Sequence, residues 1–289
     1  MTLRYELWDV FTRQALAGNP LAVVLDGSDL SDSQMQAVAK EFNLSETSFI
    51  LPSDKADVRA RYFTPATELP MAGHPSIGTS YSLHRAGKVK AELLTLELGV
   101  GIIPMRFELR NGKPEKVWME QGVPELVADV SQRAEVARAL GLELSDLVDT
   151  LPIQVVSAGN AFMLVPLDSL EVLGKARLDL SLLPDVLPQN HRSVFAFTFD
   201  APESDIRSRM FGEALGVRED PATGSAHGPL GWYIAAHKLV KRVDDYVHFE
   251  SHQGVEMGRP SQLFVSVAKD MSVAVGGEAV LVGEGELYL

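Results

Sequence analysis

Cysteine is absent from this sequence of 289 residues. Without a thiol, the chain has no disulfide, no thiolate ligand for a metal or an iron–sulfur cluster, and no cysteine nucleophile or base. Basic residues are also scarce, because 26 lysines and arginines stand against 39 aspartates and glutamates, which gives a net charge of −13. A surface of this charge argues against nucleic acid and anionic lipid as partners.

Long apolar runs are missing as well. No window holds 18 uninterrupted apolar residues, and Glu6 and Asp9 would interrupt the apolar segment of a signal peptide. We therefore expect a soluble cytoplasmic protein that has no membrane partner. Apolar residues still make up 46% of the chain, which is enough for one large core or two of ordinary size.

Motifs for cofactors and metals are not found. Residues 99–104 (GVGIIP) lack the third glycine of a dinucleotide fingerprint and a helix signal after it, and no Walker A string is present. His248, Glu250 and His252 share one strand face, but no fourth ligand follows at a recognisable spacing. Ser225 lacks the flanking glycine pattern of a hydrolase nucleophile. We expect no cofactor, no metal and no serine hydrolase.

A weak internal repeat runs through the two halves of the chain. In each half a Gly-Asn pair precedes an apolar run, an Arg-x-Phe string follows, and a turn-rich segment leads into a helix. Arg61 precedes Gly73 by nearly the same distance as Arg209 precedes Asp220, which pairs Gly73 with Asp220 between the halves. Chance similarity of short strings is the alternative, but the preserved order favours duplication.

Local patterns in the first half predict a mixture of helix and strand. Ser31 opens a capping-box string, and apolar residues at helical spacing extend it into a helix over 32–42 that Asn43 ends. Residues 47–51 and 58–63 read as two strands of a hairpin. A further helix starts near Pro75 and ends before a glycine, and strands dominate residues 89–120.

The second half shows comparable signals. Ser131 looks like a helix cap, residues 153–165 and 195–199 are strand-like, and a helix over 228–238 is expected to turn three residues inward, namely Trp232, Ala235 and Ala236. Two α+β halves, each with more strand than helix, fit these patterns. We expect one domain of residues 1–122, completed by about 275–289, and a second domain of residues 123–274.

Three segments can carry chemistry. Residues 72–78 and 220–226 are small-residue loops that enter helices, where unpaired N–H groups and the helix dipole favour a substrate carboxylate. They contain the titratable residues His74 and Asp220. Glu46 lies between a helix and an apolar strand, so it is either an exposed loop acid or a partly desolvated acid suited to proton transfer.

The sequence resembles the PhzF family of phenazine-biosynthesis isomerases, which belongs to the diaminopimelate-epimerase structural group. The matching strings follow the family order along nearly the whole chain. They are FT (11–12), GNPLAV (18–23), NLSET (43–47), RYFTP (61–65), EL (68–69), AGHPSIGT (72–79), MF (210–211), EDPATGSA (219–226), QG (253–254) and MGRPS (257–261). Each string alone is weak, but together they are highly specific.

The resemblance implies a fold and the place of the active site. It implies an α+β protein of two similar domains, each a mixed sheet rolled into a barrel around a central helix and related by an approximate two-fold axis. The active site then lies in the cleft between the domains, with helix starts on opposite walls. Related epimerases carry a cysteine at each of two loop positions where this chain has Gly73 and Asp220, so a two-thiol racemisation is excluded.

The resemblance also implies a reaction. In the family isomerase a loop glutamate, matched here by Glu46, takes a proton from one carbon of a conjugated dihydro-hydroxyanthranilate and returns it to another. His74 and Asp220 match its supporting residues. We expect burial to raise the pKa of Glu46 against His74 as a nearby cation.

Our hypothesis is a cofactor-independent isomerase that acts on a small carboxylated, unsaturated or cyclic metabolite and forms a homodimer. The expected substrate contacts are Asn19, Gly73, Thr223, Gly224 and Ser225. Two alternatives stay open: a non-catalytic metabolite-binding homologue on the same scaffold, and a racemase or epimerase with Glu46 and Asp220 as non-thiol bases.

Overall fold

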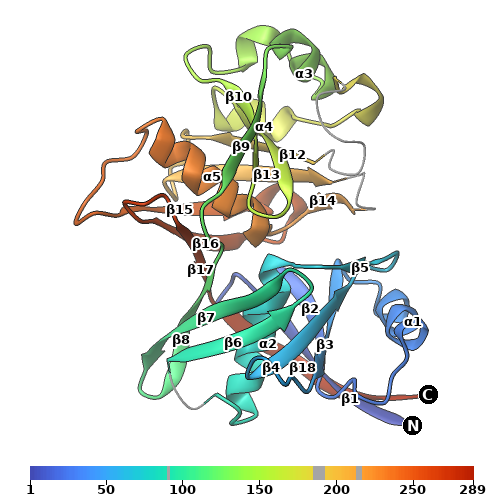
Figure 1. The fold of residues 1–289 in the computed structure, drawn as a ribbon. Helices are drawn as coiled ribbons and strands as arrows, with labels where there is room; N and C mark the ends of the chain where they lie inside the picture. Colours follow the sequence, from blue (N-terminus) through green and yellow to red (C-terminus); the bar gives the residue numbers. More distant parts are fainter. Residues whose placement is uncertain (90–91, 185–192, 213–216) are drawn as a thin grey trace. The chain divides into compact units, whose positions relative to one another are not determined.

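The computed structural model describes residues 1–89, 92–184, 193–212 and 217–289. Their contacts divide the chain into two compact units (Figure 1). Unit 1 comprises Met1–Glu120 and Ala274–Leu289, and unit 2 comprises Gln121–Val273. Both units are rich in strand and contain one long buried helix.

Unit 1 is a mixed sheet that curves around helix α2. Its strands pair in the order β17, β8, β7, β6, β4, β3, β2, β1 and β18, with β5 beside β4. Helix α2 contacts β8 near one end of this order and β18 at the other, so the sheet wraps around it. The elements are β1 (Thr2–Val10), β2 (Asn19–Val24), α1 (Asp32–Phe42), β3 (Glu46–Leu51), β4 (Val58–Phe63), β5 (Glu68–Leu69), α2 (Gly73–Arg85), β6 (Leu93–Leu98), β7 (Gly101–Arg110), β8 (Lys113–Glu120), β17 (Val273–Gly277) and β18 (Ala279–Tyr288).

Unit 2 is built on the same plan around helix α5. Its strands pair in the order β9, β10, β11, β12, β13, β15 and β16, with β14 beside β13. Short 3₁₀ turns lie at Leu144–Asp146, Leu180–Leu182 and Val255–Met257. The elements are β9 (Glu125–Val130), α3 (Arg133–Ala139), β10 (Ile153–Ser157), β11 (Ala161–Pro166), α4 (Leu170–Lys175), β12 (Val194–Thr198), β13 (Ile206–Gly212), β14 (Val217–Asp220), α5 (Gly224–Ala236), β15 (Val247–Gln253) and β16 (Ser261–Val267).

The strand pairings confirm the internal repeat. In unit 1, β2 pairs in parallel with β3, β3 is antiparallel to β4, and β4 pairs with β5 and in parallel with β6. In unit 2, β11, β12, β13, β14 and β15 repeat this series with the same directions. The central helices α2 and α5 enter at the same place in each series, and both have 13 residues. The fold is therefore α+β with two similar units.

The strand register corrects our alignment of the two halves. Tyr62 faces Leu69 across β4 and β5, and Met210 faces Asp220 across β13 and β14, so Leu69 and Asp220 occupy equivalent positions. The predicted pairing of Gly73 with Asp220 is wrong. It arose because the connection from β13 to Glu219 is longer than the one from β4 to Glu68, so equal spacing misaligned the repeats.

Local predictions in the first half are confirmed at several places. Helix α1 has the predicted bounds, the capping box of Ser31 is formed, and Asn43 adopts a left-handed conformation with φ of 50° at its end. The predicted hairpin corresponds to β3 and β4. Ser131, however, does not cap α3, because Gln132 precedes this helix and makes no side-chain cap.

The inward face of α5 was predicted wrongly. Trp232 and Ala235 are only half-buried and Ala236 is exposed, whereas Tyr233 and Ile234 are fully buried. The helix also begins at Gly224 rather than Gly228. Because every residue of α5 from Gly224 to Gly231 is buried, its sequence carries no single apolar stripe from which an inward face could be predicted. Among the described residues, no helix is long and apolar enough to span a membrane.

Close contact between β17 and the residue after β1 leaves no room for a larger side chain at Gly277. A Cβ at Gly277 would overlap the ring of Phe11, which is fully buried and has a φ of 63°. We expect Gly277→Ala to lower the free energy of unfolding by roughly 1–3 kcal/mol, as overpacking does in a rigid core. Urea unfolding followed by circular dichroism measures this change.

Gly283→Ala is the matched control. Its Cβ would lie 3.7 Å from the nearest atom of Leu7, which is ordinary van der Waals contact. Equal stability of the two variants would contradict the packing described for β17.

Candidate active site

Three predicted site residues of unit 1 stand at the beginnings of neighbouring elements. Asn19 is the first residue of β2, Glu46 is the first residue of β3, and His74 is the second residue of α2. Strands β2 and β3 run parallel and Glu46 faces Leu21, so their starts lie at the same edge of the sheet. The topology thus brings together residues that are far apart in the sequence.

A chain of side-chain contacts joins these residues. Nδ2 of Asn19 lies 3.1 Å from Nδ1 of His74, and Nε2 of His74 lies 3.5 Å from Oε2 of Glu46. Ser45 donates its hydroxyl to Oδ1 of Asn19 at 3.3 Å, which fixes the orientation of the amide. Because an amide nitrogen can only donate, Nδ1 of His74 must accept, and its proton is assigned to Nε2, facing Glu46.

His74 is a neutral imidazole in this setting. Its side chain is 4% exposed, and burial lowers its pKa to about 3. The hydrogen bond from Asn19 also requires the neutral form, because an imidazolium has no acceptor nitrogen. The expectation that His74 would act as a nearby cation is wrong, since desolvation disfavours its charged form. The contact with Glu46 is therefore not an ion pair between two full charges.

Glu46 is not an exposed loop acid. It belongs to β3, its side chain is 15% exposed, and its Oε2 atom is buried beside His74. Of the two readings left open by the sequence, the partly desolvated acid is the one that the structure supports. The sequence could not show this, because the burial of Glu46 depends on a helix that begins 27 positions later.

In unit 2, Asp220 and Thr223 are held by the side chain of Gln253. Gln253 is fully buried and donates its amide to the backbone carbonyl of Asp220 at 2.7 Å and to Oγ1 of Thr223 at 3.0 Å. Thr223 in turn donates its hydroxyl to Oδ2 of Asp220 at 2.6 Å. Because Oγ1 already accepts from Gln253, the direction of this relay is fixed and the Asp220 carboxylate receives a donor.

Gly73 and Gly224 each form the first residue of a central helix. The segments 72–78 and 220–226 thus lead into helices as predicted, although both helices begin earlier than the predicted starts near Pro75 and at Gly228. The first-turn amides of such helices lack intrahelical acceptors, which makes both ends suited to a carboxylate. The fourth residue of each helix binds the carbonyl just before the helix: Ser76 donates to Ala72 at 2.7 Å, and Nδ1 of His227 to Thr223 at 2.9 Å. Burial lowers the pKa of His227 to about 4, so it is neutral as well.

The structure groups the predicted site residues by unit. Asn19, Glu46, Gly73 and His74 belong to unit 1, and Asp220, Thr223, Gly224 and Ser225 belong to unit 2. That the two groups serve one substrate stays a prediction. Ser45 and Gln253 are positioning residues that the sequence did not single out, although both lie within the strings that match the PhzF family.

The chain matches the family model described as phenazine biosynthesis-like protein (PhzC-PhzF) over residues 8–285. It belongs to this family. The chain is 38% identical to trans-2,3-dihydro-3-hydroxyanthranilate isomerase of Pseudomonas aeruginosa over 291 residues, covering 99% of each chain. It is 35% identical to an uncharacterized isomerase of Clostridium acetobutylicum over 302 residues, covering 100% of both. The chain is thus an enzyme of the isomerase class.

Solved structures confirm the fold of this PhzF-family chain. A phenazine biosynthesis protein of the PhzF family from Bacillus anthracis superposes with a TM-score of 0.90 at 31% identity, covering 100% of both chains. A predicted epimerase from Pseudomonas aeruginosa gives 0.87 at 37% identity, covering 99% of both chains. A hydroxyproline epimerase from Agrobacterium vitis gives 0.66 at 13% identity and covers 99% of this chain and 92% of that chain, which is a likeness of fold alone.

The neutral state of His74 predicts a pH dependence of stability. The unfolded chain binds a proton at this histidine below its ordinary pKa of 6.5, whereas the folded chain does so only near 3. The unfolded state therefore binds more protons in this window, and stability falls as the pH falls from 6.5 towards 3. We expect His74→Gln to reduce this slope by about 1 kcal/mol per pH unit between pH 6 and pH 5.

Urea unfolding of both proteins at pH 7, 6 and 5 measures the two slopes. His84→Gln is the control, because His84 is only half-buried. A slope that His74→Gln leaves unchanged would show that His74 does not lose its proton on folding.

Proposed function

We propose that this PhzF-family protein shifts a proton between two carbons of a small carboxylated, unsaturated or cyclic substrate without a cofactor, with Glu46 as the proton carrier. The observation that carries the proposal is the contact between the buried Oε2 of Glu46 and the Nε2–H of a neutral His74. A carboxyl group that accepts and returns a proton needs access to both of its protonation states.

The neutral imidazole supports this exchange. An imidazolium at the same place would hold Glu46 as the anion, because an opposite charge favours the ionised carboxylate. A neutral Nε2–H instead offers one hydrogen bond to the Glu46 carboxylate or to negative charge that develops on the substrate. Asn19 takes part by holding this tautomer of His74 rather than by supplying charge.

We propose that the substrate carboxylate binds at helix N-termini. Gly73 opens α2 and Gly224 with Ser225 opens α5, so their backbone amides are available donors. Thr223 acts through Asp220, since its hydroxyl is donated to that carboxylate. Asp220 then stands as a fixed hydrogen-bonding or acid/base group for the same substrate.

The first substrate to test comes from the relatives. The Pseudomonas aeruginosa protein of 38% identity is named for trans-2,3-dihydro-3-hydroxyanthranilate, a compound with a carboxylate and a conjugated ring. We propose this compound, or a similar carboxylated dihydro-aromatic acid, as the substrate class. The homodimer and the cytoplasmic location expected from the resemblance stay predictions.

Replacing the proton carrier tests the proposal. We expect Glu46→Gln to lower turnover of trans-2,3-dihydro-3-hydroxyanthranilate by about 10² to 10⁴, because the amide keeps the shape but cannot carry the proton. Glu41→Gln is the matched control, since Glu41 is an exposed residue of α1. The measurement is product formation in D₂O, with deuterium incorporation at carbon read by mass spectrometry.

Turnover of Glu46→Gln within about tenfold of the parent would contradict the role of Glu46. A protein that the compound stabilises thermally, with neither turnover nor deuterium incorporation, would instead be a metabolite binder. Inversion of a stereocentre without migration of a double bond would point to an epimerase.

A further inference from the structure

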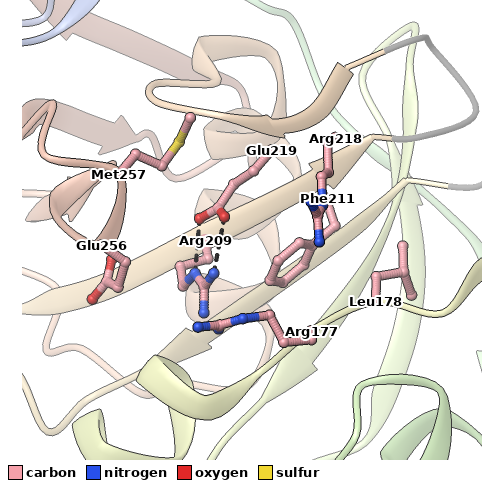
Figure 2. A pocket seen from close by; sticks show the side chains of 8 residues that line it. All are labelled: Arg177, Leu178, Arg209, Phe211, Arg218, Glu219, Glu256 and Met257. Carbon is pink, nitrogen blue, oxygen red and sulfur yellow. Dashed lines mark hydrogen bonds and ion pairs between the residues drawn. The ribbon is translucent and has the colours of Figure 1, made fainter.

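Unit 2 contains a pocket that the proposed reaction does not use. The pocket has a volume of about 520 Å³, and its lining includes Arg177, Arg209, Phe211, Arg218, Glu219 and Glu256. Figure 2 shows the three arginines around the ring of Phe211. We call it the arginine pocket.

The arginine pocket lies on the opposite face of β14 from the Asp220 carboxylate. Adjacent residues of a strand point to opposite faces, so Glu219 faces Arg209 while Asp220 faces Thr223. Likewise, Arg209 and Phe211 share one face of β13, and Met210 between them points to the other face. The pocket is therefore separate from the Asp220 group within unit 2.

Both carboxylates of the pocket are already paired. Glu219 receives two hydrogen bonds from Arg209, at 2.8 and 2.9 Å, and Glu256 lies 3.4 Å from Nε of Arg207. Within the described part of the chain, neither Arg177 nor Arg218 has a carboxylate partner. Among the described residues, these two positive charges thus stay uncompensated at the pocket, although the net charge of the protein is −13.

The guanidinium groups of Arg177 and Arg209 are held close together by shared acceptors. Nη1 of Arg177 donates to the carbonyls of Gly174 and Ala176 at 3.0 and 2.6 Å. Nη1 of Arg209 donates to the same two carbonyls at 3.4 and 2.9 Å. Because like charges repel, a site that holds them together favours an anion between or beside them.

At the equivalent place in unit 1 a second carboxylate binds the arginine. Arg61 is paired with Glu68 at 2.7 Å and lies over Phe63, just as Arg209 is paired with Glu219 and lies over Phe211. Arg61 then binds the carboxylate of Asp32 at 2.7 Å. In unit 2 helix α4 supplies backbone carbonyls to Arg209 instead, and two further arginines are present.

From this difference we infer that the arginine pocket binds a small organic anion with two negative charges and an apolar body. Arg177 and Arg218 would pair with the anionic group, since guanidinium binds carboxylate and phosphate in a forked geometry. The ring of Phe211 and the apolar side chain of Leu178 would contact the body of the ligand. The ligand is a phosphate monoester or a dicarboxylate.

Calorimetric titration of the full chain tests the inference. The probes are phenyl phosphate and phthalate, with phenol as the uncharged control. We expect phenyl phosphate, phthalate or both to bind, with one molecule per chain, and we expect phenol not to bind. Binding of only one dianion identifies the source of the charge as phosphate or dicarboxylate.

Variants locate the binding. We expect Arg177→Gln combined with Arg218→Gln to weaken the binding by about tenfold or more, because two charge-assisted hydrogen-bonding groups are lost. Arg138→Gln combined with Lys241→Gln is the control, because both residues are exposed in unit 2, lie outside the pocket, and their loss changes the net charge equally.

Three results would overturn the inference. They are no binding of either dianion, undiminished binding in the arginine variant, and an equal loss in the control variant. Circular dichroism of each variant shows whether it is folded, and Arg218→Gln alone serves if the double variant unfolds, because Arg218 is exposed and Arg177 binds backbone carbonyls. With this single variant, unchanged affinity overturns the inference and weaker binding supports it.

Discussion

The hydrogen bond from the Asn19 amide to Nδ1 of His74 is the contact on which the proposed chemistry of unit 1 depends. It decides which ring nitrogen carries the proton, and burial keeps the ring uncharged. Ser45 decides which end of the Asn19 amide faces the ring. Glu46 therefore meets an oriented N–H group instead of a cation, which is the setting that a carboxyl group needs to take up and release a proton.

The two units repeat the same strand order and central helix, but they carry different acidic and hydrogen-bonding residues. In unit 1 the position equivalent to Asp220 is Leu69, and the acid stands instead at the start of β3. In unit 2 the acid ends β14 and is held by Thr223 and Gln253. The repeat thus preserves the helix N-termini, which we propose as carboxylate sites, while the acids and hydrogen-bonding groups differ between the units.

Short-range features of this structure could be predicted from the sequence. The capping box of α1 and the hairpin of β3 and β4 depend on neighbouring residues, and the loops that lead into α2 and α5 lie within strings shared with the PhzF family. The α+β class followed from the same patterns. These elements are specified locally, so reading them required no knowledge of tertiary contacts.

Features set by contacts between distant residues could not be predicted. The burial of Glu46, the neutral state of His74 and the orientation of α5 depend on packing between elements far apart in the chain. The hydrogen bond from Gln253 to Asp220 joins residues of β15 and β14, and no sequence spacing predicts this contact. Burial determines the charge of a histidine and the desolvation of an acid, and burial cannot be derived from composition.

Nitrogen NMR of the imidazole measures the protonation state of His74. With ¹⁵N-labelled histidine, we expect Nδ1 to give the shift of an unprotonated acceptor and Nε2 that of a protonated donor, and neither to change between pH 5 and pH 8. A His74 ring that carries its proton on Nδ1, or that titrates near the ordinary histidine pKa of 6.5, would show that Glu46 does not face the N–H group of a neutral imidazole.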